Sequence, residues 1–334
     1  MANADETLVG EDAIIALLRP LAAPGGLGFR DDCATLTPRP GTDLVLKTDP
    51  VAEGVHFLPE DAPEDIAWKA LAVNVSDLAA KGARPLGYLM ALSFPSAPTR
   101  GWLSRFADGL AEAQAAFGCP LFGGDTDRRA GPITISITVF GEVETGRMVQ
   151  RATAKPGDLL YVSGTIGDAW LGLRLCREPE RIAAWGLTEA QAADLVARYR
   201  RPQPRLALGP ALRRHAQASM DLSDGVVKDL GRMLRASGVA GHLDLARVPL
   251  SAAVSQVVQR QPALLPQLAA AGDDYEILAA VPPSAAHAFE IDARSAGLAV
   301  TEIGHVMAGD PGRLRIVDAT GSDVQLQSEG WDHF

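Results

Sequence analysis

The clearest alternation of apolar and polar positions lies at residues 133–139, where isoleucine or valine alternates with threonine or serine. A period of two places successive side chains on opposite faces of a strand. The segment is therefore predicted to be a strand with one apolar face and one face of small polar side chains.

A helical period follows Thr99, the predicted N-cap, where apolar residues recur three or four positions apart. They are Trp102, Phe106, Leu110, Ala113 and Phe117. This spacing predicts one buried stripe of a long helix, so its aromatic residues belong to the core and not to a cofactor motif. A second helix is predicted from Pro63, which suits a first helical position, to Gly82.

Weaker patterns complete the predicted order of elements. Further helices are predicted at residues 11–20, 169–175, 188–199, 224–236 and 284–296, and strands at 44–47, 86–94, 159–163, 275–281, 300–306 and 314–317. The pattern breaks at residues 151–158 and then restarts. Strands and helices mix without strict βαβ alternation, so we predict two α+β domains, residues 1–150 and 151–334.

Composition narrows the class of protein. The chain has 334 residues, 47% hydrophobic and 22% charged, and a formal net charge of −10. These values are typical of a globular protein and argue against nucleic acid or an anionic membrane as a partner. No apolar run reaches membrane-spanning length and no signal peptide is recognised, so we expect a cytoplasmic location.

Several common site types are excluded by their missing motifs. The three cysteines, Cys33, Cys119 and Cys176, form no C-x-x-C pair, so we expect buried free thiols and no structural zinc. There is no P-loop, no complete dinucleotide fingerprint, no H-E-x-x-H and no G-x-S-x-G. His56 is the only histidine close to the acidic segments, and a structural hydrogen bond is an equally good role for it.

Aspartates recur at the ends of apolar segments instead of on helix faces shared with basic residues. They are Asp31, Asp32, Asp49, Asp77, Asp125, Asp221, Asp224, Asp273 and Asp274. Two carboxylates ~4 Å apart repel by roughly 4 kcal/mol at an effective dielectric of about 20. Mg²⁺, usually held by carboxylates together with substrate phosphates, would offset that repulsion. The pattern predicts a magnesium–phosphate enzyme.

The alternative role for each aspartate is to form a turn or cap a helix. That role explains any one of them alone, but it does not explain Asp49, Asp77, Asp125 and Asp224 together. Asp31 and Asp274 are the ones for which we favour a purely structural role.

The acidic residues belong to short segments that follow one another in a characteristic order: residues 31–34 (DDCA), 48–49 (TD), 53–57 (EGVHF), 69–85, 123–126 (GGDT), 151–158 (RATAKPGD), 221–225 (DLSDG), 272–276 (GDDYE) and 330–334 (GWDHF). Read in this order, they resemble the thiamine-monophosphate kinase family over nearly the whole chain. Each segment is weak evidence alone, and the ordered set is highly specific.

The resemblance implies the two-domain fold shared with aminoimidazole ribonucleotide synthetase and selenophosphate synthetase. In that fold the N-terminal domain forms a homodimer through its sheet, and the C-terminal domain completes the nucleotide site. The implied reaction is direct in-line transfer of a phosphoryl group from ATP to thiamine monophosphate, assisted by several Mg²⁺ ions, in thiamine diphosphate biosynthesis. It needs no general base, since a phosphate oxygen is already a competent nucleophile.

The resemblance also implies roles for individual residues. The implied metal ligands are Asp32, Lys47, Thr48, Asp49, Asp77, Asp125, Asp221 and Asp224. The implied ATP contacts are Gly124, Asp125, Arg151 and Ser223. The implied substrate contacts are His56, Asp273 and Trp331.

Three positions depart from the family pattern. Lys47 stands where the family usually has Ser or Thr, so its carbonyl keeps the ligand position while its side chain adds a positive charge. Arg30 replaces a glycine, and either contacts phosphate or faces solvent. Asp273 replaces a glutamate and shortens the reach by one methylene.

Two rival interpretations stay open on the sequence alone. Another enzyme of the same superfamily is one, although the loop at residues 25–28 lacks the reactive cysteine of selenophosphate synthetase. The chain also lacks the C-terminal cysteine of a hydrogenase-maturation relative, since it ends in His333-Phe334. The other rival is a non-catalytic protein that binds a nucleotide or a thiamine phosphate.

Overall fold

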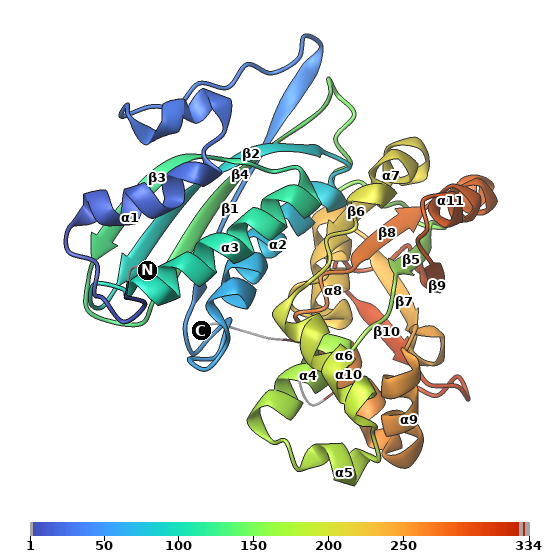
Figure 1. Cartoon of the computed structure of the whole chain (residues 1–334). Coiled ribbons are helices and arrows are strands. Elements are labelled where there is room, and N and C mark those ends of the chain that lie inside the picture. Colours follow the sequence, from blue (N-terminus) through green and yellow to red (C-terminus); the bar gives the residue numbers. More distant parts are fainter. Residues whose placement is uncertain (1–2, 327–329, 331–334) are drawn as a thin grey trace. The chain divides into compact units, whose positions relative to one another are not determined.

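The computed structural model describes residues 3–326 and Gly330, and it divides the chain into two compact units (Figure 1). Unit 1 comprises Met1–Leu78 and Ala83–Gly146, and unit 2 comprises Ala79–Gly82 and Arg147–Phe334. The change from unit 1 to unit 2 after Gly146 lies close to the domain boundary predicted from the sequence.

Unit 1 is built on a four-stranded sheet with the order β1-β4-β2-β3. Its strands are β1 (Thr42–Ala52), β2 (Arg84–Phe94), β3 (Leu121–Arg128) and β4 (Thr134–Glu144). β4 pairs antiparallel with both β1 and β2, and β2 pairs parallel with β3. The strand of clearest alternation, β4, therefore lies inside the sheet.

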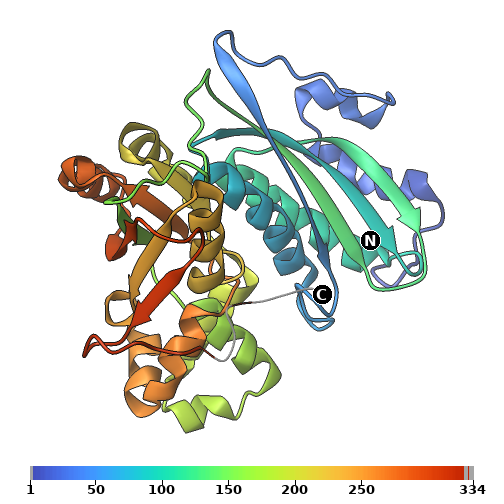
Figure 2. The same cartoon turned by 180° about the vertical axis from the view of Figure 1, so that it is seen from behind.

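Two long helices, α2 (Pro63–Ala80) and α3 (Arg100–Phe117), cover one face of this sheet (Figures 1 and 2). The side chain of Thr99 accepts the N–H of Trp102 and so caps α3, as predicted. Most of the predicted stripe is confirmed, with Phe106, Leu110 and Ala113 at 0% exposure. The unit also contains α1 (Glu11–Leu18), η1 (Arg19–Leu21) and η2 (Pro24–Phe29).

The opposite face of the unit 1 sheet carries more apolar side chains than the sequence analysis anticipated. Along β4, Ile135, Ile137 and Val139 are buried while the intervening Thr and Ser residues are partly exposed, as predicted. Leu46 of β1, however, is 63% exposed, and Leu89 of β2 is 38% exposed. The cross-strand register Leu46–Phe140 and Thr138–Leu89 places these residues on the face of β4 that bears Thr138 and Phe140.

Unit 2 contains a six-stranded mixed sheet with the order β10-β7-β9-β5-β8-β6. The strands are β5 (Leu159–Ser163), β6 (Ala218–Asp221), β7 (Ala240–Asp244), β8 (Ile277–Val281), β9 (Val300–Met307) and β10 (Leu314–Val317). All neighbours are antiparallel except β10 and β7. β8, which lies between β5 and the edge strand β6, is buried along its whole length.

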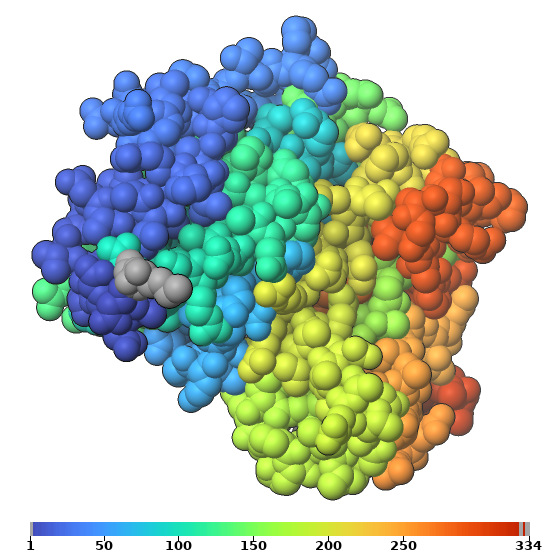
Figure 3. Space-filling model, viewed as in Figure 1, coloured from blue at the N-terminus to red at the C-terminus, as the bar shows by residue number. Residues whose placement is uncertain are grey.

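The helices of unit 2 enclose three apolar clusters. They are α4 (Asp168–Arg177), α5 (Arg181–Trp185), α6 (Glu189–Arg200), α7 (Gly209–His215), α8 (Val226–Ser237), α9 (Ala252–Arg260), α10 (Leu265–Ala269) and α11 (Pro283–Ser295). Short turns η3 (Leu206–Leu208), η4 (Leu245–Arg247) and η5 (Pro262–Leu264) connect them. The segment from α4 to α6 forms one end of the unit (Figure 3). No described helix is long and apolar enough to cross a membrane.

Some sequence predictions fail in the structure, and the reasons are physical. Only Asp221 ends a strand, because β1 and β3 extend past Asp49 and Asp125, and Asp77 lies within α2. The predicted helix at 224–236 begins two residues later, at Val226, so Asp224 precedes it. Cys119 is buried as expected, but Cys33 is exposed because its segment belongs to no regular element.

Candidate functional site

An ion-pair group in unit 1 brings together three of the predicted metal-site residues. Lys47 and Asp49 lie two positions apart on β1 and so share one face of the strand. Asp77 comes from α2, which packs on that face. The Lys47 Nζ atom lies 3.0 Å from Asp49 Oδ2 and 2.9 Å from Asp77 Oδ2. We call these three residues the β1–α2 group.

The charge of Lys47 is stabilised within this group. Burial alone would lower the pKa of its ammonium, but the carboxylates of Asp77 and Asp49 outweigh burial and raise it. The group is partly open to solvent, with Asp49 42% and Asp77 24% exposed. The two carboxylates therefore face a permanent cation and remain within reach of a ligand.

Asn74 fixes the backbone of Asp49 against α2. Its Oδ1 atom accepts the N–H of Asp49 at 2.9 Å, and its Nδ2 atom donates to the carbonyl of Ala70 at 3.0 Å. Asn74 is fully buried and lies one helical turn before Asp77. A single amide thus sets the spacing between the strand and the helix that carry the two carboxylates.

The hydroxyl of Thr48 points away from the β1–α2 group, because neighbouring side chains alternate across a strand. Its Oγ1 atom donates to the carbonyl of Ile137 at 3.1 Å and accepts the hydroxyl of Thr138 at 3.0 Å. A metal ion shared with Asp49 would therefore meet the backbone of Thr48, not its hydroxyl.

His56 lies in the turn that follows β1. Its Nδ1 atom accepts the N–H of Ala52 at 3.1 Å, so a neutral imidazole carries its proton on Nε2. The Nε2–H group is a donor suited to a phosphate oxygen.

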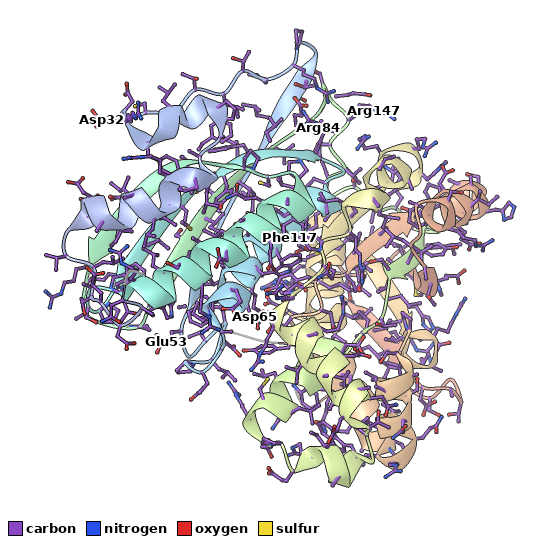
Figure 4. The ribbon with its side chains drawn as sticks, viewed as in Figure 1. Asp32, Glu53, Asp65, Arg84, Phe117 and Arg147 are labelled. Carbon is purple, nitrogen blue, oxygen red and sulfur yellow. The ribbon has the colours of Figure 1, made fainter. Side chains whose placement is uncertain are left out.

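Asp32 and Asp125 lie outside the β1–α2 group. Asp32 is exposed in the segment before β1, at the opposite end of unit 1 from Glu53 (Figure 4), and makes no hydrogen bond or ion pair among the described residues. Asp125 is exposed on β3, where its Oδ1 atom accepts the N–H of Thr126 at 2.8 Å. Beside it, a Cβ atom on Gly124 would lie 1.7 Å from the carbonyl oxygen of Met90, so the β2–β3 pairing itself requires glycine there.

In unit 2, a buried aspartate organises the turn that holds Ser223 and Asp224. Asp229 of α8 is fully buried, and its Oδ2 atom accepts the N–H of Ser223 at 3.1 Å and of Asp224 at 2.9 Å. Burial raises the pKa of the Asp229 carboxyl to about 6. Arg232, one turn further along α8, contacts both Asp229, at 2.8 Å, and the carboxylate of Asp224. Asp224 is thus paired with a cation, as Asp49 is in unit 1.

A second loop, residues 272–276, is tied to this turn through the backbone. The N–H of Asp273 donates to the carbonyl of Ser223, and the N–H of Tyr275 to that of Leu222, both at 2.9 Å. Asp273 and Tyr275 have positive φ values of 74° and 50°, which are uncommon for residues with a side chain. Aspartate tolerates this region better than most residues do, so the local backbone suits Asp273.

Asp274 has the structural role that the sequence predicted for it. Its Oδ2 atom accepts the N–H of Gly167 at 2.8 Å, immediately before α4. An acidic side chain at a helix N-terminus complements the helix dipole. Burial nevertheless raises the pKa of the Asp274 carboxyl well above its ordinary value.

Glu276 anchors the end of the same loop through a buried charge network. Its carboxylate, 0% exposed, accepts the hydroxyl of Ser163 at 2.6 Å, Arg198 Nη2 at 2.8 Å and Arg205 Nε at 2.7 Å. Two guanidinium groups thus neutralise one buried carboxylate. Asp273 is therefore presented by a loop that is fixed on both sides.

The remaining residues predicted for the site have few contacts that define a position in it. Arg151 of unit 2 is exposed, and its carbonyl accepts the hydroxyl of Ser237 at 3.3 Å. Asp221, at the end of β6, is only 7% exposed. Arg30 is exposed, in agreement with the solvent-facing alternative. Trp331 lies outside the described residues.

The donor chemistry of the β1–α2 group suits Mg²⁺, because carboxylate oxygens are the ligands that this ion prefers. The point on which the two Oδ2 atoms converge is, however, taken by the ammonium of Lys47. Among residues 3–326 and Gly330, no three His, Cys, Asp or Glu side chains lie close enough to hold a metal ion. The carboxylates of Asp49 and Asp77 therefore suit Mg²⁺ as ligands, but the position between their Oδ2 atoms is occupied by the ammonium of Lys47.

Three residues that position the predicted ones were missed from the sequence: Asn74, Asp229 and Arg232. A signal for Asn74 was present, since it is the one polar residue in the run of residues 70–75 (ALAVNV), one turn before Asp77. Asp229 and Arg232 gave no comparable signal, because charged residues in a helix usually face solvent.

Two family models match the chain. AIR synthase related protein, N-terminal domain, matches residues 30–143, and AIR synthase related protein, C-terminal domain, matches residues 155–317. Both ranges fall within the regions expected for the two domains, and the predicted fold class is confirmed.

The chain is also similar to curated and solved proteins along nearly its whole length. It is 43% identical to thiamine-monophosphate kinase of Caulobacter vibrioides, covering 96% of this chain and 90% of the relative. A crystal structure of thiamine-monophosphate kinase from Stenotrophomonas maltophilia superposes with a TM-score of 0.80 at 37% identity, covering 94% of this chain and 96% of the other. A structure of AaThiL complexed with AMPPCP and TMP superposes with a TM-score of 0.76 at 32% identity, covering 97% of each chain.

Proposed function

The chain belongs to the thiamine-monophosphate kinase family of AIR synthase related enzymes, and from this we propose that it phosphorylates thiamine monophosphate with ATP. The products are thiamine diphosphate and ADP. The observation that carries the proposal is the similarity, over 97% of the chain, to AaThiL complexed with AMPPCP and TMP. The acidic residues and the lack of a nucleophile–base motif agree with phosphoryl transfer.

We infer that Asp32, Thr48, Asp49, Asp77, Asp125, Asp221 and Asp224 hold Mg²⁺, with Lys47 contributing its backbone carbonyl. When bound, the ions supply positive charge that neutralises the phosphate oxygens and orients ATP. The convergence of Asp49 and Asp77 supports this assignment in unit 1. In unit 2, the turn that carries Asp224 is fixed by Asp229 before any ligand binds.

The chain's own residues are assigned to binding and orientation. ATP is contacted by Gly124, Asp125, Arg151 and Ser223. The substrate is contacted by His56, Asp273 and Trp331. His56 donates its Nε2–H to a phosphate oxygen, because its Nδ1 atom is already an acceptor for Ala52. No residue acts as a general base, since the acceptor phosphate oxygen attacks directly.

The function is tested with a coupled assay that measures ADP release from ATP in the presence of Mg²⁺. We expect turnover with thiamine monophosphate and no comparable turnover with free thiamine, which lacks the acceptor phosphate. Aminoimidazole precursors serve as a control for the synthetase branch of the superfamily. Equal rates with thiamine and thiamine monophosphate would refute the substrate assignment, and ADP release with neither would favour a binding protein.

We further propose that the protein is a homodimer formed through the open face of the unit 1 sheet. Leu44 and Leu46 of β1 are 45% and 63% exposed, and Leu89 of β2 is 38% exposed. The alternation and register of the strands put these residues on the face opposite the one that packs on α2, on the two strands that flank β4. A second copy would cover them symmetrically.

Leu46→Glu is expected to weaken this dimer by at least about a hundredfold in Kd. Burying one leucine contributes about 1.5–3 kcal/mol, and a two-fold interface buries it twice. Light scattering over a range of micromolar concentrations measures the effect. Ile291→Glu is the matched control. Ile291 lies on α11 of unit 2, is similar in size to leucine and is 45% exposed, so its substitution should leave the mass in solution unchanged. A wild-type mass of one chain with full activity would contradict the dimer.

The roles of the two domains are part of the same proposal. We assign dimerisation and the larger share of the ATP and Mg²⁺ contacts to unit 1, and the remaining contacts to unit 2. The expected cytoplasmic location remains a prediction.

A further inference from the structure

The ammonium of Lys47 lies where the two carboxylates of the β1–α2 group converge. It contacts Asp49 at 3.0 Å and Asp77 at 2.9 Å, in each case through Oδ2. Both carboxylates are positioned by backbone elements that do not depend on Lys47, because Asn74 joins the backbone of Asp49 to α2. The ammonium therefore occupies a position between two acids whose spacing is set by the fold.

A divalent ion cannot share this position with the ammonium. An ion bound to the same two oxygen atoms would lie within a few ångströms of Nζ and would be repelled by its charge. Two carboxylates and one ammonium leave a net charge of −1, whereas the same carboxylates with one divalent ion are neutral. The side chain of Lys47 thus changes how many metal ions the acidic residues require.

We propose that Lys47 is a resident cation that takes the place of one divalent metal ion between Asp49 and Asp77. This inference rests on the proposed function for the identity of the metal and the phosphate ligands. An ammonium has three donors, and two of them are used by the carboxylates. The third donor is left for an oxygen of an incoming phosphate. Lys47 would then offset part of the charge of the two carboxylates and also position the phosphate.

The proposal predicts that the residue at position 47 sets the metal stoichiometry. Lys47→Ser removes the ammonium and opens the position to an ion. Mn²⁺ is titrated into the full chain with electron paramagnetic resonance detection, first alone and then with AMPPCP. We expect Lys47→Ser to bind one more Mn²⁺ ion than the wild type, or to bind Mn²⁺ at least about tenfold more tightly.

A second variant, Lys47→Met, tests the proposal by thermal stability in case Lys47→Ser does not fold. Lys47→Met keeps the unbranched side chain up to the Cε position and removes the charged amine, so the two carboxylates repel each other without metal. In EDTA at low ionic strength it should melt several degrees below the wild type, and Mg²⁺ should restore most of the difference. Arg313→Ser breaks an exposed ion pair with Asp310 and is the control for a lost surface charge. It should change neither measurement.

The proposal is overturned if Lys47→Ser titrates with Mn²⁺ as the wild type does in both number and affinity. It is equally overturned if the melting temperature of Lys47→Met shows no greater response to Mg²⁺ than that of the wild type. Neither measurement needs turnover. A protein without kinase activity would refute the proposed function and still leave the metal titration readable.

Discussion

Asp49→Asn is expected to lower kcat by at least about a hundredfold, a loss of about 2.7 kcal/mol of transition-state stabilisation. Asparagine keeps the size of the side chain and one oxygen acceptor but removes the charge that the metal ions and phosphates require. The backbone of Asp49 is held by Asn74, so the strand should stay in place. The lost ion pair with Lys47 is partly exposed to solvent and contributes little to folding.

The measurement is kcat in the ADP-release assay, together with the melting temperature in EDTA. Asp43→Asn is the matched control, because Asp43 lies on the same strand and, among the described residues, accepts only the N–H of Gly146. It should keep near wild-type turnover. A structural role for Asp49 predicts the reverse pattern, near-normal turnover with a lower melting temperature, and that result would remove Asp49 from the site.

Asp224→Asn makes the same test in unit 2. Asp224 is paired with Arg232, and its backbone N–H is held by Asp229, so the turn survives the substitution. A comparable loss of turnover is expected. Retained activity would remove Asp224 from the site without affecting the assignment of Asp49.

Glu276→Gln is expected to give the largest loss of stability, about 3–5 kcal/mol in the free energy of unfolding. The carboxylate of Glu276 is 0% exposed and neutralises Arg198 and Arg205, which are themselves 21% and 19% exposed. A neutral amide would leave both guanidinium groups in the interior without a counter-charge. The melting temperature should fall by roughly 6–20 °C.

The control for this prediction is Glu178→Gln. Glu178 also accepts two guanidinium groups, from Arg174 and Arg181, but it lies at the surface of unit 2. Because solvent screens these two ion pairs, the melting temperature of Glu178→Gln should change little. If both variants melt at the same temperature, the burial of the Glu276 network does not stabilise the fold.

The regular elements with a strong period could be predicted from the sequence. The alternation at residues 133–139 gave β4, and the spacing from Trp102 to Phe117 gave α3. β3 was missed because Gly123, Gly124 and the charged residues after them show neither alternation nor an apolar run. β6 and β7 were missed because four or five residues carry too little pattern.

The candidate site was predictable in composition but not in arrangement. The order of the acidic segments pointed to Asp49, Asp77 and Asp224 as candidates, and the resemblance supplied their implied roles, which stay predictions. The contact between Lys47 and Asp77 depends on how β1 packs on α2, which no local pattern encodes. The opposite orientation of Thr48 follows from the strand pleat, but only once β1 was known to continue through it.

The two faces of β1 bear different kinds of side chain, with Lys47 and Asp49 on one face and Leu44 and Leu46 on the other. Because side chains alternate strictly, inserting or deleting one residue within the strand would exchange the two sets. The acids would then leave α2, and the leucines would leave the open face. Length changes in this strand should therefore be far less tolerated in evolution than single substitutions at its exposed positions.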